Sequence, residues 1–244
     1  MGKKKKQNGK AAPAAVKAAP DYKKYIGLGL VPLAFFAVEA FGWVFLRGST
    51  GTRWPLVFGL LWTVILSAVV LGMPAKAGRI VFGLVYGLCA IYAVVETGYY
   101  ILFKEMMWLS DFRYASEGSD YFSVLLSYPI HWWLGILVLI GLGVAAVWRF
   151  PRGKYNWKQT VAAIVLVALA GSCAYQLPYD QFAQDKDVKF ARSDYGRMQS
   201  LEAAYENLFN THRLYQVCGL YQTFWKDIYA HSIYPLTPAY VQEH

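Results

Sequence analysis

The sequence predicts an all-α membrane protein with five transmembrane helices, the N-terminus inside and the C-terminus outside, followed by amphipathic interface helices. Of its 244 residues 57% are hydrophobic and only 16% are charged, and the apolar residues form long uninterrupted runs. Apolar runs of about 18 or more residues are typical of transmembrane helices, because a helix satisfies its own backbone polar groups inside lipid. Basic residues are also distributed unevenly between the two sides of these runs.

The predicted domains follow one another along the chain. Residues 1–24 form a basic tail rich in Lys, Ala and Pro, and we expect it to be disordered because it has too little apolar content to pack. A five-helix transmembrane domain follows over residues 25–177. Short connections make its first three spans antiparallel neighbours, and likewise its last two. The spans are expected at about 25–46, 55–73, 80–103, 129–148 and 159–177.

The distribution of charge predicts the orientation, because cytoplasmic flanks of membrane spans carry the excess of Lys and Arg. Placing the N-terminal tail inside puts fourteen basic residues on that side, against four in the outer connections. Topology alone therefore accounts for the net charge of +9. Attraction of the tail to an anionic inner leaflet is the alternative. We expect no nucleic-acid partner and an extracellular C-terminus.

Two stretches outside the spans are amphipathic. Residues 104–128 join the third and fourth spans and carry aromatic residues of the kind that lie in the membrane interface. Residues 178–244 are expected to form an extracellular juxtamembrane helical linker, since their apolar positions are periodic rather than continuous. Gly219 interrupts the clearest helix of this linker, residues 213–229, at a cost of about 1 kcal/mol.

The helix over 213–229 is expected to lie along the outer leaflet. Spacings of three and four place its apolar residues on one stripe, which we expect to face lipid or the helix bundle. This candidate interface stripe comprises Leu214, Val217, Tyr221, Phe224, Trp225 and Ile228. The opposite, polar face would carry Arg213, Gln216, Gln222, Lys226 and Asp227.

Two carboxylates inside the predicted spans, Glu39 and Glu96, are candidate functional residues, because charge within a membrane is costly. Each lies about 10 Å below the outer surface, as the rise per helical residue implies. One interpretation is an outward-opening cleft for a lipid headgroup, formed by Glu39, Glu96, His131, Arg47 and Tyr99. The other is that Glu39 pairs with Arg47 or a tyrosine hydroxyl and only holds helices together. The spacing Gly83-x-x-x-Gly87 in the third span permits close helix packing.

No catalytic signature is present in the sequence. Dinucleotide-binding, P-loop, zinc-protease and serine-hydrolase motifs are all missing. The three cysteines, Cys89, Cys173 and Cys218, have no metal-binding spacing. We therefore expect no catalytic, cofactor-binding or metal-binding residues in this chain.

Three stretches carry a family resemblance. They are "FFAVEAFGWVFLR" at 35–47, "ETGYYILFKEMMWLSDF" at 96–112 and "LYQVCGLYQTFWKDIY" at 214–229. Their order, together with the topology, means that the chain over about residues 25–234 resembles the membrane half of the lipoteichoic acid synthase-like family. Members of this family are membrane-bound relatives of sulfatases and alkaline phosphatases.

The resemblance implies an anchor in a bacterial cell membrane. The family's extracellular α/β domain, which is not in this sequence, holds a threonine nucleophile and a divalent metal, usually manganese. It transfers glycerophosphate from phosphatidylglycerol, or in relatives transfers or cleaves another phospho- or sulfo-group. Implied partners are thus membrane lipids such as phosphatidylglycerol and the catalytic domain, and we expect the chain to end at a domain boundary. The alternative is a non-enzymatic multi-pass scaffold or partner-binding protein. A small transporter is disfavoured because the sequence shows no internal repeat.

Overall fold

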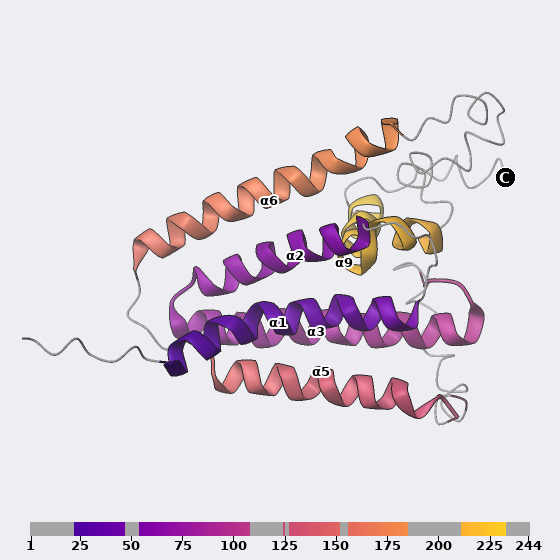
Figure 1. The fold of residues 1–244 in the computed structure, drawn as a ribbon, viewed down its shortest axis with the longest axis horizontal. Helices are drawn as coiled ribbons and strands as arrows, with labels where there is room; N and C mark the ends of the chain where they lie inside the picture. The colour runs from indigo at the N-terminus through magenta and orange to yellow at the C-terminus, as the bar shows by residue number, and fades with distance from the viewer. Residues whose placement is uncertain are drawn as a thin grey trace, which may run out of the picture.

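The computed structural model describes residues 22–46, 54–107, 124, 127–151, 156–184 and 211–232. Within these ranges every long element is a helix (Figure 1). The helices are α1 (Tyr22–Phe45), α2 (Trp54–Leu71), α3 (Ala75–Phe103), α5 (Ile130–Trp148), α6 (Trp157–Gln184) and α9 (Thr211–Ser232). The first five are long and apolar enough to cross a membrane. The prediction of an all-helical chain with five helices able to span a membrane is therefore confirmed for the described residues.

The helix boundaries differ from the expected ones in three places. α1 begins at Tyr22, so the last three residues of the tail 1–24, which was expected to be disordered, belong to a helix. α3 begins at Ala75, directly after Pro74, so its first turns include Lys76 and Arg79 ahead of the apolar run. Long basic side chains tolerate this position because their charged ends can reach the membrane surface. α6 continues to Gln184, beyond the expected end of the last span. The tail 1–21, most of the segment 104–128, and residues 185–210 and 233–244 of the predicted linker lie outside the described residues.

α1 is the central helix of the bundle. It packs against α2, α3, α5 and α9, whereas α6 packs mainly against α2 at the periphery (Figure 1). The core forms where α1 meets α3, with Phe35 packed edge-on against Phe82 at a ring-centroid distance of 5.3 Å. Large apolar side chains such as Leu137 and Ile164 instead face outward. An apolar exterior of this kind suits contact with lipid.

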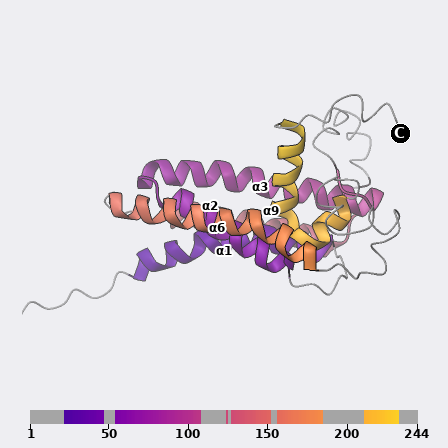
Figure 2. The ribbon, with the colours of Figure 1, turned by 90° about the horizontal axis from the view of Figure 1, so that it is seen from above.

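The helices alternate in direction, so the bundle has two distinct ends. α1, α3 and α6 finish at one end, where α2 and α5 begin (Figure 1). α9 lies at that same end and crosses the bundle instead of extending along it (Figure 2). We call this the α9 end, and the other the opposite end.

Candidate functional site: the α9 docking site

Glu39 of α1 connects the first membrane helix to α9. Its carboxylate is only 4% exposed. Oε1 accepts a hydrogen bond from the backbone N–H of Leu220 at 2.7 Å, and Oε2 accepts one from the N–H of Tyr221 at 3.1 Å. The N–H groups at the start of a helix have no partner within the helix, and the helix dipole there favours negative charge. Glu39 therefore acts as a capping group for a helix that lies 181 residues further along the chain.

Gly219 makes this cap possible by dividing α9 into two arms, residues 211–218 and 220–232. Its backbone has φ 78° and ψ 179°, a conformation that is essentially restricted to glycine. The helix starts afresh after this break, which exposes the N–H groups of Leu220 and Tyr221 to Glu39. The Thr223 hydroxyl donates to the Gly219 carbonyl at 2.7 Å and completes the start of the second arm.

Missing side chains provide the space for the Glu39 carboxylate. A Cβ on Gly219 would clash with Oε1 of Glu39, and a Cβ on Gly59 of α2 would lie 2.6 Å from its Cγ. Gly42 of α1 lies beside α9, and a Cβ there would make an ordinary van der Waals contact with Leu220 at 3.4 Å. The approach of α2 and α9 to Glu39 of α1 thus depends on glycine in α2 and in α9.

Further hydrogen bonds attach the second arm to the bundle. The Tyr221 hydroxyl donates to the Phe35 carbonyl at 2.7 Å. Burial raises the pKa of the Tyr221 phenol well above its usual range, so the hydroxyl keeps its proton at neutral pH. Gln222 accepts from the Trp62 indole at 2.6 Å and donates to the Ala174 carbonyl at 3.3 Å. Gln222 therefore links α9 to both α2 and α6.

The residues that receive α9 form two stripes with the same spacing. Phe35, Glu39 and Gly42 lie four and three residues apart on α1. On α2, Pro55 and Trp62 lie against α9 and Gly59 leaves room for Glu39, again four and three apart. Such spacing puts each trio on one helix face. We call these six residues the α9 docking site.

The second intramembrane glutamate, Glu96 of α3, is fully buried close to this site. Its Oε2 accepts a hydrogen bond from the Met107 backbone N–H at 3.2 Å, and its side chain is hydrogen-bonded to Tyr92 one turn earlier. Tyr92 also lies within electrostatic range of Glu39 and of Asp227 from α9. Three buried carboxylates, Glu39, Glu96 and Asp227, thus lie near enough to Tyr92 to act on it electrostatically, and Glu96 is the one hydrogen-bonded to it.

The other candidates for the headgroup cleft are not part of this group. His131 is exposed at the start of α5, and its ring stacks on that of Phe45 with a centroid distance of 5.5 Å. The ring of Tyr99 packs against that of Phe103, with a centroid distance of 4.6 Å. Arg47 lies outside the described residues. Among the residues described, no group of three or more His, Cys, Asp or Glu has the arrangement to hold a metal ion.

The residues of the candidate interface stripe of α9 differ in exposure and do not all face the same surroundings. Leu214 and Tyr221 are buried in the bundle, Phe224 and Ile228 are half-buried, and Trp225 is 45% exposed beside Trp62. The side chain of Val217 lies outside the described residues.

The expectation that Gln222 and Asp227 belong to an exposed polar face is wrong, because both are only 2% exposed. The break at Gly219 rotates the second arm relative to the first (Figure 2), so one helical wheel does not describe both. The partners that the structure shows for Glu39 were also unexpected, since they are backbone amides of α9 and not a tyrosine hydroxyl. A pairing with Arg47 lies outside the described residues.

Sequence reasoning missed Gly59 and Trp62 altogether, and it placed Gln222 on the wrong face of α9. Two glycines could have pointed to the docking site: Gly42, three residues after Glu39, and Gly219, which interrupts residues 213–229. Both mark places where a backbone approaches closely, but neither names the partner that approaches.

Comparison with known proteins returns no relative of the chain. No protein-family model, no curated protein and no solved structure matches it. The resemblance to the lipoteichoic acid synthase-like family stays a prediction. The geometry of the bundle and of α9 therefore carries the functional argument.

Proposed function

We propose that the chain is a membrane anchor that holds α9 rigidly across one end of its five-helix bundle and so fixes what α9 carries relative to the membrane surface. The observation that supports this most directly is the capping of the second arm of α9 by both oxygens of Glu39. Hydrogen bonds to a charged acceptor are about twice as strong as neutral ones, and they are directional. A helix that only rested on lipid would not need such a contact.

The uneven distribution of basic residues supports placing the α9 end outside the cell. The exposed Lys76, Arg79 and Lys158 all lie at the opposite end of the bundle, where the positive-inside rule places the cytoplasm. α9 would then lie on the extracellular side. In whole cells, an impermeant thiol reagent should label a cysteine placed at Tyr229 and should not label one placed at Lys158.

The resemblance extends this proposal to a specific role. In lipoteichoic acid synthase-like proteins the membrane part precedes an extracellular catalytic domain with a metal such as manganese, which acts on phosphatidylglycerol. The α9 docking site would keep such a domain at a constant height above the lipid that it uses. A non-enzymatic scaffold would use the same rigid helix to present a partner-binding surface.

The buried position of Glu39 favours this anchoring role over direct contact with a lipid headgroup. Both carboxylate oxygens are occupied by α9, and the side chain is almost entirely enclosed. A headgroup at Glu39 would have to displace the second arm. The contribution of Glu39 is therefore structural positioning of α9.

Rigid attachment of α9 can be tested by measuring distances between spin labels. Labels at Leu134 on α5 and Tyr229 on α9, both exposed positions, would be introduced into the chain with Cys89, Cys173 and Cys218 all replaced by Ala. We expect one narrow distance distribution in lipid nanodiscs, and a broad one for Glu39→Ala. Glu105→Gln is the control, because this glutamate lies near the same end of the bundle and is exposed. A broad distribution in the unaltered chain would refute the proposal.

A further inference from the structure

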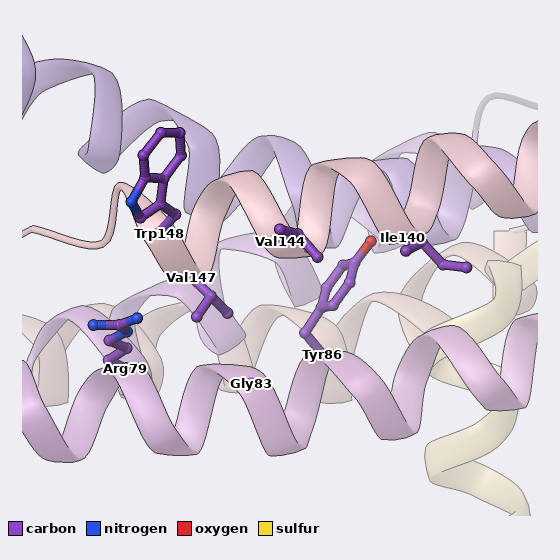
Figure 3. Close-up of a pocket in the computed structure, with 8 residues that line it drawn as sticks. Arg79, Gly83, Tyr86, Ile140, Val144, Val147 and Trp148 are labelled. Atoms are coloured by element: carbon purple, nitrogen blue, oxygen red, sulfur yellow. The ribbon is translucent and has the colours of Figure 1, made fainter.

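A second feature of the fold, far from α9, is a groove between α3 and α5. It has a volume of about 460 Å³ and opens on the outer surface of the bundle. Figure 3 shows Tyr86 of α3 beneath Val144 and Ile140 of α5, with Arg79 and Trp148 at the end of the groove. Its walls are apolar, and Val144 is 64% exposed on its rim.

Glycines and a fixed tyrosine keep the groove open. Among the described residues, a methyl group of Val147, at 3.9 Å, is the one atom within 4 Å of a Cβ added to Gly83. Across the groove the ring of Tyr86 rests directly against Gly143, and its hydroxyl donates to the Leu139 carbonyl at 2.6 Å. The groove is therefore preformed. Since it lies within the membrane-spanning part of both helices, a hydrocarbon chain is the natural occupant.

One end of the groove is strongly basic. Arg79 lines it, Lys76 is exposed one turn earlier, and the Arg149 guanidinium lies 5.2 Å from the centre of the Trp148 ring. The acidic side chains that the structure describes lie toward the α9 end; they are Glu39, Glu96, Glu105 and Asp227. Positive charge at the groove is thus not offset by any carboxylate among the described residues nearby.

We propose that this groove binds one anionic phospholipid, with an acyl chain over Gly83 and the phosphate at Arg79. Apolar walls and a basic end match the two parts of such a lipid. Each basic residue near a membrane surface contributes about 1 kcal/mol of attraction for anionic lipid, which is about a fivefold change in affinity.

A second copy of this chain fits the groove less well. The spacing Gly83-x-x-x-Gly87 would allow a helix to approach, and Gly87 has no neighbour within 4 Å. A symmetric dimer through this face would, however, bring Lys76, Arg79 and Arg149 of both copies together. Like charges at that distance repel, whereas a phosphate would neutralise them.

Native mass spectrometry of the whole chain in detergent can test the proposal. The probes are dioleoyl phosphatidylserine and dioleoyl phosphatidylcholine, which share acyl chains and differ in net charge. Phosphatidylserine is chosen because the proposed anchor role makes no claim about it, so the two proposals can fail separately. We expect one phosphatidylserine to be retained in preference to phosphatidylcholine.

Two variants separate the parts of the site. Arg79→Gln should reduce the preference for phosphatidylserine about fivefold, while the control Lys158→Gln, an exposed lysine at the same end outside the groove, should not. Gly83→Leu should fill the groove and reduce retention of both lipids. Its control is Gly87→Leu, one turn further along α3, where the added side chain meets open space. Val144→Trp fills the groove from α5 and serves if Gly83→Leu fails to fold.

Three results would overturn the proposal. Unchanged retention in both Gly83→Leu and Val144→Trp would mean that no acyl chain occupies the groove. Competition by soluble phosphoserine as strong as that by the lipid would indicate a site for phosphate alone. A dimer mass that disappears in Gly83→Leu would identify a second copy as the occupant.

Discussion

The two ends of the bundle use polar residues in opposite ways. At the α9 end Glu39, Thr97 and Gln222 are buried, and each is hydrogen-bonded inside the protein. At the opposite end Lys76, Arg79 and Lys158 are exposed. Buried polar groups fix geometry, because leaving them unsatisfied is costly, whereas exposed charges act on lipid and solvent. The α9 end is therefore specialised for holding a helix, and the opposite end for meeting the membrane surface.

The thiol of Cys218 offers a direct measure of this difference. It lies fully buried in the first arm of α9, and burial raises its pKa, so the docked helix should react slowly with thiol reagents. With Cys89 and Cys173 replaced by Ala, the labelling rate of Cys218 reports how often α9 leaves the bundle. The predictions below use this rate.

The largest effect is expected for Glu39→Ala. It removes the acceptor of two backbone N–H groups, each of which costs about 1–3 kcal/mol when buried without a partner. Docking should weaken by about 3 kcal/mol, and labelling of Cys218 should accelerate about a hundredfold. Glu105→Gln should leave the rate unchanged. An unaltered rate in Glu39→Ala, with the substitution verified, would show that the cap does not hold α9.

Gly219→Ala should come next. The added Cβ would clash with Glu39, and alanine would occupy a backbone conformation that costs about 1–3 kcal/mol outside glycine. We expect labelling of Cys218 about thirty times faster than in the parent chain. Gly171→Ala on α6 is the control, since nothing lies within 4 Å of its Cβ position. Equal rates in the two variants would contradict the described break in α9.

A smaller effect is expected for Gln222→Leu, which tests the link from α9 to α2 and α6. Leucine is similar in size but cannot form the hydrogen bonds that Gln222 makes with the Trp62 indole and the Ala174 carbonyl. A net loss of about 1 kcal/mol should raise the labelling rate about fivefold. The fluorescence of Trp62, measured against a Trp62→Phe chain, should change at the same time. A faster rate without a change in Trp62 would assign the effect to a different contact.

Substitutions at the opposite end should have the smallest effect on docking. Lys76→Gln and Lys158→Gln alter exposed side chains that do not contact α9, so labelling of Cys218 should change by less than about twofold. The thermal melting temperature should also stay close to that of the parent chain. A large effect of either change on Cys218 would mean that the two ends are coupled.

Much of the fold could be predicted from the sequence because membrane spans are a local property. A run of about 20 apolar residues must form a helix in lipid whatever surrounds it. The five spans followed directly from such runs, whereas the start of α1 at Tyr22, the polar first turns of α3 and the extension of α6 to Gln184 were missed. Glu39 and Glu96 could also be singled out, since a carboxylate inside a span is rare enough to need an explanation.

The docking site could be predicted only in part. The helical spacing of the apolar residues in α9 could be recognised in the sequence. Assigning them to one face assumes a continuous helix, however, and Gly219 divides α9 into two arms. Gln222 was therefore placed on the exposed face although it lies in the interior. A helical wheel cannot show that a polar side chain will be buried against a partner such as Trp62.

The sequence by itself determined which helices of this chain are able to cross a membrane, because hydrophobicity acts locally along each helix. Only the tertiary structure decided that the Glu39 carboxylate would cap a helix 181 residues away. That choice depends on Gly59 and Gly219 leaving space for the same side chain, and on backbone N–H groups that become available only where α9 breaks. The space for the Glu39 side chain forms only when α1, α2 and α9 pack together, so it cannot be predicted from any single stretch of the sequence.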